Sequence, residues 1–159
     1  MKIPSTPAVR AMKAAKIDFE PYLYKYEEKG GTRQTADELK VDEHSVVKTL
    51  VLQTDEGKCL IMLQHGDMEV SLKEMARIIN VKKVFPSDAK TAMKLTGFQF
   101  GGTSPFGTKT KLPVYAEKTI FNLDKIFINA GKRGFIAGIR KKKKKNCLEI
   151  TEVEAGIKQ

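Results

Sequence analysis

Cysteine and histidine are scarce in this 159-residue sequence, which has two of each. Two cysteines are too few for a disulfide scaffold or a four-ligand zinc site, so a reducing, cytoplasmic setting is the default expectation. No apolar run approaches the ~18 residues of a membrane-spanning helix. The sequence also shows no secretory signal pattern of basic start, apolar core and small-residue cleavage site. We therefore expect no membrane partner.

Familiar catalytic motifs are also missing. There is no P-loop, no strand-linked Gly-x-Gly-x-x-Gly and no His-Glu-x-x-His. His44 and His65 lack partners at familiar metal-ligand spacing, and Asp67 and Glu69 near His65 fit a solvated hairpin end better than a ligand set. Cys59 lies in an apolar run, where a cysteine more often packs in the core than reacts. We therefore predict no metal and no other cofactor, and find little support for a protein nucleophile.

The charge balance is strongly positive. There are 29 Lys and Arg against 19 Asp and Glu, a net charge of +10. Such an excess favours a polyanionic partner such as RNA, DNA or anionic lipid. Six consecutive cations supply +6 of this charge: Arg140, Lys141, Lys142, Lys143, Lys144 and Lys145. This run is either a solvated surface or a nucleic-acid contact.

Helix and strand signals alternate without a linker, so we expect one domain over residues 1–159. Cap and periodicity signals predict helices at 6–16 and after Thr35, a helical turn at 43–47, and helices opened by Ser71 and Ser87. Gly30-Gly31 is expected to break a strand at 22–26. Further strands are predicted at 49–54, 58–64, 98–100, 112–116 and 126–129, with a hairpin at 55–57. The order indicates a mixed α/β fold with a mostly antiparallel or mixed sheet and flanking helices.

Three segments stand out as candidates for chemistry. Lys48 shares a strand face with Leu50 and Leu52, so it either serves a ligand or points to water. The glycine-rich segment 101–107 could bring its backbone N–H groups to an anion or a developing oxyanion, or could be an ordinary tight connection. The segment 129–134 places Lys132 and Arg133 between glycines at a strand end, which suits either a phosphate grip or a charged turn.

Taken together, four motifs resemble the YbaK/EbsC family of aminoacyl-tRNA deacylases, which includes the editing domain of bacterial prolyl-tRNA synthetases. They are Thr6-Pro7-Ala8-Val9, Val47-Lys48-Thr49-Leu50, Gly-Gly-Thr-Ser-Pro-Phe-Gly at 101–107, and Gly-Lys-Arg-Gly at 131–134. The resemblance spans about Thr6 to Ile139 and is greatest to the Cys-tRNA(Pro) deacylases. It implies a barrel-like mixed sheet with flanking helices. It also implies metal-free removal of cysteine from tRNA(Pro), in which the substrate thiol attacks its own ester.

The resemblance also implies roles for individual residues. Lys48 would hold the terminal phosphate–ribose region or the ester, and the backbone of Gly101 and Gly102 would position the aminoacyl carbonyl. Further substrate contacts are implied at Tyr24, Thr103, Ser104, Pro105, Gly107, Asn129, Gly131, Lys132, Arg133 and Gly134. Tyr22 and Tyr26 are expected on the strand face of Tyr24, where stacking on the terminal adenine competes with core packing. The cations at 140–145 would then contact the tRNA acceptor stem.

Three positions depart from the family pattern. A pocket Phe has no counterpart near Gly30-Gly31, Asn129 replaces a serine, and Ile136 lies where an aspartate is usual. These departures motivate an alternative, a non-catalytic or differently specific module that binds tRNA or prolyl-tRNA synthetase. A third hypothesis, based on charge and tyrosines alone, is a general RNA-binding protein.

Overall fold

The computed structural model describes residues 2–141 and 148–158. Within these residues the helical segments are α1 (Pro7–Ala14), α2 (Gly31–Leu39), η1 (Glu43–Ser45), α3 (Leu72–Ile78), α4 (Ala89–Thr96) and η2 (Lys118–Asn122). The strands are β1 (Glu20–Leu23), β2 (Val46–Thr54), β3 (Cys59–His65), β4 (Met68–Val70), β5 (Val84–Pro86), β6 (Val114–Glu117), β7 (Lys125–Lys132), β8 (Phe135–Arg140), β9 (Ile150–Val153) and β10 (Gly156–Lys158).

The main sheet is mixed, as the sequence predicts. Its order in the described chain is β1-β8-β7-β2-β3-β6-β9, with β5 also paired to β2 and a separate β10-β4 pair. The hairpin of β2 and β3 is antiparallel, whereas β2 with β7, β3 with β6 and β6 with β9 run parallel. The three parallel pairs join segments far apart in the sequence, so no local turn signal could reveal them.

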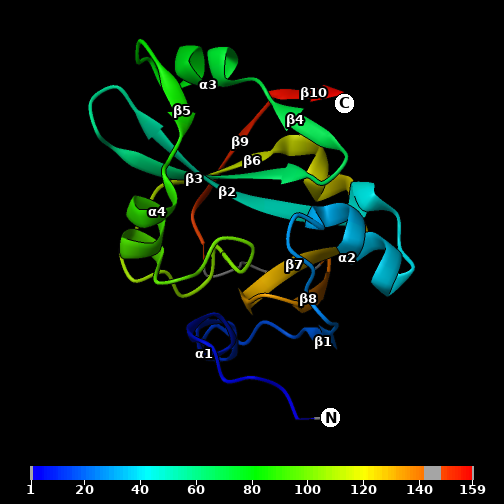
Figure 1. Ribbon diagram of the computed structural model, residues 1–159. Coiled ribbons are helices and arrows are strands. Elements are labelled where there is room, and N and C mark those ends of the chain that lie inside the picture. The colour runs from blue at the N-terminus through cyan, green and yellow to red at the C-terminus, as the bar shows by residue number, and fades with distance from the viewer. Residues whose placement is uncertain (1, 142–147, 159) are drawn as a thin grey trace.

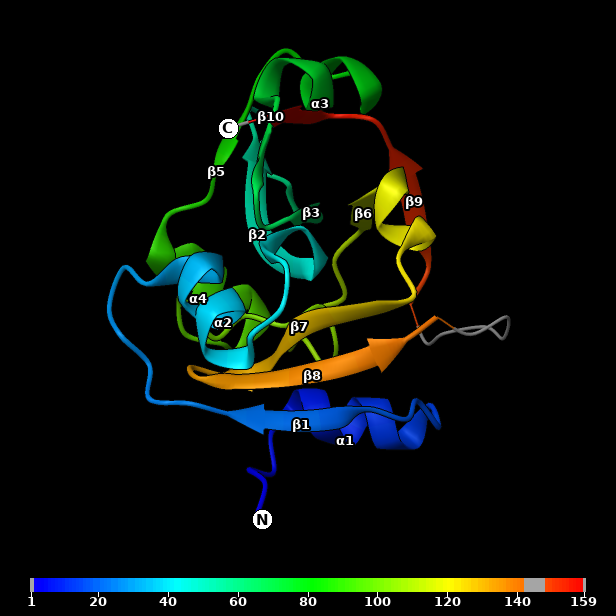
Figure 2. The ribbon, with the colours of Figure 1, turned by 90° about the vertical axis from the view of Figure 1, so that its right-hand side faces the viewer.

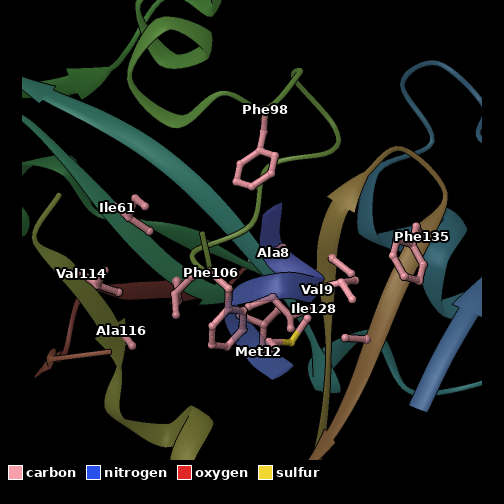
Figure 3. Packing of buried hydrophobic residues seen from close by; sticks show 14 of the residues in the cluster. Ala8, Val9, Met12, Ile61, Phe98, Phe106, Val114, Ala116, Ile128 and Phe135 are labelled. Carbon is pink, nitrogen blue, oxygen red and sulfur yellow. The ribbon is translucent and has the colours of Figure 1, made fainter. Parts of the chain in front are cut away.

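The sheet is strongly curved, which gives the barrel-like shape that the sequence predicts (Figures 1 and 2). One buried cluster collects Val47 of β2, Ile61 of β3, Ala116 of β6 and Ile128 of β7. Strands from separate parts of the sheet therefore face one interior. Met12 and its helix α1 close that interior against β7, as Figure 3 shows.

Helices α2 and α3 cover the outer faces of this curved sheet. Ala36 of α2 packs with Val46, Phe127 and Ile136 on the opposite side of β2, β7 and β8 from α1. Helix α3 packs on the distal half of the β2–β3 hairpin through Met75 and its neighbours. Among residues 2–141 and 148–158, no helix combines the length and apolar character needed to cross a bilayer.

Several local signals are confirmed. Thr6 caps α1 by accepting a hydrogen bond from Val9 N at 3.0 Å, and Ser71 caps α3 in the same way through Glu74 N. Gly97 ends α4 with a φ of +82°, the left-handed conformation that glycine adopts without steric cost. Short polar caps and glycine stops depend on neighbours in the chain, so a sequence can reveal them.

Four local predictions are wrong. Helix α2 begins at Gly31 rather than after Thr35, so the glycine pair opens a helix as well as ending an extended segment. Asp88 rather than Ser87 caps α4. Strand β1 covers Glu20–Leu23 rather than residues 22–26. Residues 98–100 form no strand, because Phe98 turns into the core and a tight turn follows it.

Candidate functional site

Lys48 lies where two strands meet at a parallel junction. Val46 and Val47 of β2 pair with Phe127 and Ile128 of β7, and the next residues along the two strands are Lys48 and Asn129. Because side chains alternate along a strand, Lys48 projects from the same face as Val46, and Asn129 from the same face as Phe127. Val46 packs against Phe127, so Lys48 and Asn129 project from the same face of the sheet. Lys48 is half-buried there, so it is not a strand-end lysine fully in water.

Asn129 connects this junction to the glycine-rich loop. Its Nδ2 donates to Gly101 O at 3.1 Å and to Lys132 O at 3.2 Å. Its Oδ1 accepts from Gly131 N at 2.7 Å and Lys132 N at 3.2 Å. One side chain therefore closes the bulged turn between β7 and β8 and fixes Gly101 beside it. The strand register thus places Lys48 next to Asn129, and Asn129 holds Gly101; we call this group, where the glycine-rich loop meets β2 and β7, the loop edge.

Gly101 and Gly102 are required by close packing. A side chain at Gly101, whose φ is +86°, would overlap the hydroxyl of Tyr26, with an ideal Cβ 2.6 Å from Tyr26 Oη. A Cβ at Gly102 would lie 2.9 Å from Arg133 N. The Gly102 amide already donates to Gln99 O at 2.9 Å, so it is not free to hold an anion. Of the two glycine amides, that of Gly101 is the better donor for a ligand.

The rest of the loop mainly holds itself and α1 together. Ser104 is fully buried and its Oγ accepts from Phe106 N, while Thr103 Oγ1 donates to Gln99 O at 3.3 Å. Pro105 is buried. A Cβ at Gly107 would lie 2.3 Å from Pro7 O. These contacts show that the glycines and hydroxyl groups of the loop stabilise its own fold and its packing on α1.

The turn between β7 and β8 has a similar internal basis. A Cβ at Gly131 would meet Phe98 and the cap residue Thr6, whose Oγ1 donates to Ala130 O at 2.6 Å. Gly134 approaches the backbone of Tyr24 and accepts a hydrogen bond from Tyr24 N. Both glycines have positive φ and serve close backbone packing. Lys132 and Arg133, in contrast, point outward.

The three tyrosines do not share one open face. Tyr24 contacts the α2 cluster and its hydroxyl is 2.7 Å from Thr35 Oγ1, and burial raises the pKa of its phenol. Tyr22 packs edge-on to Phe127, with ring centroids 5.7 Å apart. Tyr26 lies against Gly101, with the Arg133 guanidinium 5.0 Å from its ring centroid. Tyr26 is therefore the tyrosine of the loop edge, which the alternation pattern could not single out.

The basic run is only partly described. Arg140 ends β8 and lies 4.0 Å from the carboxylate of Glu20. The amide of Lys141 donates to Asp124 O at 2.7 Å, which fixes the backbone beyond β8. Lys142, Lys143, Lys144 and Lys145 lie outside the described residues.

Thr49, beside Lys48, has an unusual hydroxyl. Its Oγ1 is buried and has no hydrogen-bond partner among the described residues. Such a group costs about 1–3 kcal/mol. The motif Val-Lys-Thr-Leu contained this threonine, but nothing in its spacing indicated an unsatisfied hydroxyl.

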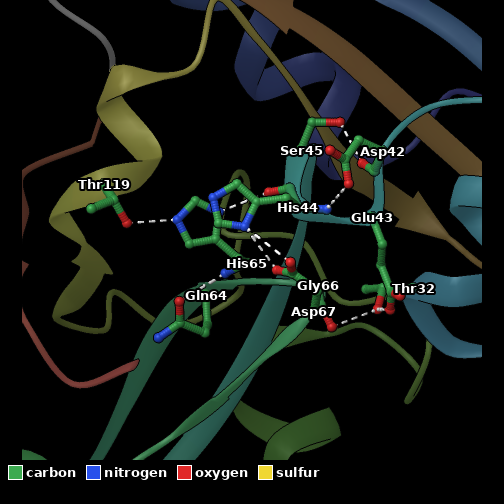
Figure 4. Close-up of polar contacts among 10 residues, drawn as sticks. All are labelled: Thr32, Asp42, Glu43, His44, Ser45, Gln64, His65, Gly66, Asp67 and Thr119. Atoms are coloured by element: carbon green, nitrogen blue, oxygen red, sulfur yellow. Dashed lines mark hydrogen bonds and ion pairs between the residues drawn. The ribbon is translucent and has the colours of Figure 1, made fainter. Parts of the chain in front are cut away.

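A second polar cluster joins η1, the turn after β3, and η2 (Figure 4). The rings of His44 and His65 are stacked, with centroids 3.7 Å apart and planes 7° from parallel, and His44 Nδ1 is 2.9 Å from Asp67 Oδ1. His65 is fully buried; its Nδ1 donates to His44 O and its Nε2 accepts from Thr119 Oγ1, both at 2.7 Å. Sequence separation concealed this cluster, because the two histidines are 21 positions apart.

This arrangement keeps His65 neutral. Burial lowers the pKa of its imidazole, and both ring nitrogens are occupied. His44, His65 and Asp67 bring possible ligand atoms within 4.8 Å of one another. A metal must lie in the plane of each imidazole that binds it, and two nearly parallel stacked rings have no common plane. The cluster is therefore better suited to joining three segments than to holding a metal.

The described residues offer no activated thiol at the loop edge. Cys59 begins β3 opposite Gln53, five positions along β2 from Lys48. Burial raises the pKa of its thiol, which keeps it protonated at neutral pH. The groups at the edge are instead a lysine ammonium, a backbone amide and an arginine, which bind anions and polarise carbonyls.

Comparisons with known proteins place this fold in a class. A crystal structure described as a candidate trans-editing enzyme for prolyl-tRNA synthetase superimposes with a TM-score of 0.80 and 18% identity, over 97% of this chain and all of that one. The fold is therefore the mixed α/β fold of that structure. The family model for the aminoacyl-tRNA editing domain matches residues 27–145. The chain belongs to the aminoacyl-tRNA editing domain family.

Two relatives illustrate the range of this similarity. A protein of Enterococcus faecalis, EbsC, named as a candidate Cys-tRNA(Pro)/Cys-tRNA(Cys) deacylase, is 28% identical over 81% of this chain and 79% of its own length. A proline--tRNA ligase of Lactobacillus johnsonii is 25% identical over 63% of this chain but only 18% of its own length. The chain thus resembles a separate small protein over most of its length and a minor part of a much larger ligase.

Proposed function

We propose that this chain is a trans-editing aminoacyl-tRNA deacylase that removes cysteine from Cys-tRNA(Pro), working as a single domain. The observation that carries the proposal is the junction of β2 and β7, which places Lys48 beside Asn129 and the tethered Gly101 within an editing-domain chain. The similarity to EbsC supports cysteine and tRNA(Pro) as the amino acid and the tRNA. Small apolar differences between amino acids are worth only ~1–3 kcal/mol, so mischarging calls for a separate editing step.

The proposed roles follow from the chemistry of the edge. The Lys48 ammonium neutralises the terminal phosphate–ribose region of the tRNA. The Gly101 amide donates to the ester carbonyl, where negative charge develops during attack. The nucleophile is the thiol of the substrate. Its sulfur bonds to the carbonyl carbon, the ester C–O bond breaks, and the thiol proton ends on the ribose oxygen. The products are a cyclic thiolactone and free tRNA.

The occupied or unreactive side chains favour this substrate-assisted route. The Cys59 thiol is held protonated, and the hydrogen bonds of His65 keep it from acting as a base. Asn129 uses both its oxygen and its nitrogen in backbone contacts. A reactive group that arrives with the substrate removes the need for a protein nucleophile.

Deacylation of Cys-tRNA(Pro), Ser-tRNA(Pro) and Ala-tRNA(Pro) tests the proposal. We expect loss of cysteine only, because serine and alanine lack the thiol. Lys48→Ala should reduce turnover to background while the protein stays folded, and Lys73→Ala, an exposed lysine on α3, should match the wild type. No ester loss from any of the three tRNAs would overturn deacylation and leave the non-catalytic binding module. Full activity of Lys48→Ala would remove Lys48 from the site.

A further inference from the structure

Phe100 is the most exposed of the large hydrophobic side chains in the described residues, at 77% exposure. Isolated exposed apolar residues are common, so exposure alone means little. What distinguishes Phe100 is its place. It directly precedes Gly101, and it lies on the segment after α4 that runs beside the turn of β7 and β8 (Figures 1 and 2).

The backbone under Phe100 is held rigidly. Gly102 N donates to Gln99 O at 2.9 Å, which closes a four-residue turn with Phe100 and Gly101 at its centre. The φ of +86° at Gly101 is the value that a type II turn requires at its third residue. Asn129 also holds Gly101 O. The phenyl ring is therefore presented to solvent on a fixed turn.

Arg133 braces the same turn from the β7–β8 side. Its Nε donates to Phe100 O at 2.8 Å, and its guanidinium lies 5.0 Å from the centroid of the Tyr26 ring. Its two terminal nitrogens make no hydrogen bond within the part of the chain that the structure describes. The edge thus combines a fixed exposed aromatic ring with a pre-oriented cation that still has donors to offer. Lys132, also exposed, adds a second positive charge.

A flat exposed ring beside phosphate-binding cations is the combination that binds single-stranded nucleic acid, because every base has a face on which an aromatic ring can stack. We propose that Phe100 stacks on an unpaired base of the single-stranded 3′ tail of tRNA while Arg133 contacts the adjoining phosphate. This inference rests on the proposed function, since it places the tail where its aminoacyl end reaches Gly101. The tyrosines cannot take this role, because Tyr22 and Tyr24 are packed against Phe127 and Thr35, and Tyr26 already faces Arg133.

Binding to RNA that carries no amino acid tests the inference, because this measurement involves no hydrolysis. Two RNAs are compared by fluorescence anisotropy: an acceptor-stem minihelix with its unpaired 3′ tail, and the same duplex made blunt. The wild type should prefer the tailed RNA. Phe100→Ala should bind it about 5- to 150-fold more weakly, the range expected for one base stacked on an aromatic ring, and should bind the blunt duplex unchanged. Phe100→Tyr should keep the preference.

Matched variants separate stacking from charge and from folding. Ile157→Ala removes another exposed apolar side chain, 51% exposed on β10, and should leave both affinities unchanged. Phe100→Ala should keep the salt dependence of binding, whereas Arg133→Gln should flatten it by about 0.7 in the log–log slope, one phosphate of a single strand. Thermal unfolding of each variant checks that the fold is intact.

The outcomes are distinguishable. An equal preference for the tailed RNA in the wild type and Phe100→Ala overturns the inference, even if Cys-tRNA(Pro) is deacylated. Equal weakening on the tailed and blunt RNAs also overturns it, since Phe100 would then serve the loop or the duplex. A tail preference that depends on Phe100 supports the inference even in a protein without deacylase activity, in which case only the proposed function falls.

Discussion

Replacing Asn129 by aspartate should detach Gly101 from the β7–β8 turn while changing almost nothing in size. The two acceptor contacts at Oδ1, from Gly131 N and Lys132 N, survive. The two donor contacts, to Gly101 O and Lys132 O, are lost, and a carboxylate oxygen then faces two carbonyl oxygens. At about 0.5–1.5 kcal/mol for each hydrogen bond, the lost contacts cost about 1–3 kcal/mol. The melting temperature should fall by about 2–4 °C for each kcal/mol.

The effect on deacylation should fall on the chemical step. Displacing the Gly101 amide by about 1 Å from the ester carbonyl should lower kcat by roughly 100-fold, whereas KM should change little because the proposed contact of Lys48 with the tRNA is kept. The assays are thermal unfolding and steady-state loss of the cysteinyl ester from Cys-tRNA(Pro), which gives kcat and KM separately. Asn122→Asp, an exposed residue of η2, provides the same charge change away from the loop. If the Asn129 and Asn122 variants behave alike in both assays, the tether has no role.

Three further predictions concern the framework around the edge. The free energy of unfolding should be constant above about pH 6.5 and fall by up to about 1.4 kcal/mol per pH unit below it. The reason is that the pKa of buried His65 is lowered in the folded protein, so the unfolded chain binds a proton first as the pH falls. Urea unfolding at several pH values should show this slope, and His65→Gln should reduce it. Gly57→Ala should cost ~1 kcal/mol of stability, and Gly107→Ala at least twice as much. Both glycines have positive φ, but only at Gly107 would the added Cβ overlap backbone, at Pro7 O. Equal losses would contradict this. Thr49→Val should add about 1 kcal/mol of stability by removing an unsatisfied hydroxyl, whereas Thr54→Val should destabilise, since Thr54 Oγ1 accepts from Glu56 N and Lys58 N.

Signals confined to a few neighbouring residues were predictable from the sequence. The cap at Thr6, the turn of the β2–β3 hairpin and the glycine stop after α4 each depend on contacts within about four residues. The helix start after Gly30-Gly31 was not predictable in this way, because Gln34 folds back over Gly30, with Nε2 donating to Lys25 O and Oε1 accepting from Glu27 N. Those tertiary contacts start the helix earlier than the capping pattern at Thr35 indicates.

The residues of the candidate site likewise divide into those that the sequence reveals and those that depend on contacts between distant segments. Lys48 could be found, because a lysine on an apolar strand face is conspicuous. The roles of Asn129, Tyr26 and Phe100 could not, because each depends on pairing between segments: Asn129 reaches Gly101 across 28 positions, and Arg133 reaches Phe100 across 33. The departure at Ile136 has a packing explanation, since its side chain is buried against Val46 and Phe127, on the sheet face that also carries Lys48.

The groups offered at the edge also bear on how one amino acid would be selected. The loop turns Ser104 and Pro105 inward and presents the backbone of Gly101 outward. In the proposed function, a backbone amide and a lysine contact the ester carbonyl and the phosphate, which every aminoacyl-tRNA possesses, so neither can distinguish cysteine from alanine or serine. Under the proposed function, selection therefore comes from reactivity: all three amino acids can occupy the edge, and only cysteine brings a nucleophile. Ser-tRNA(Pro) should then bind with an affinity close to that of Cys-tRNA(Pro) and inhibit its deacylation competitively. A failure to compete would show that a side-chain pocket, rather than the substrate thiol, makes the choice.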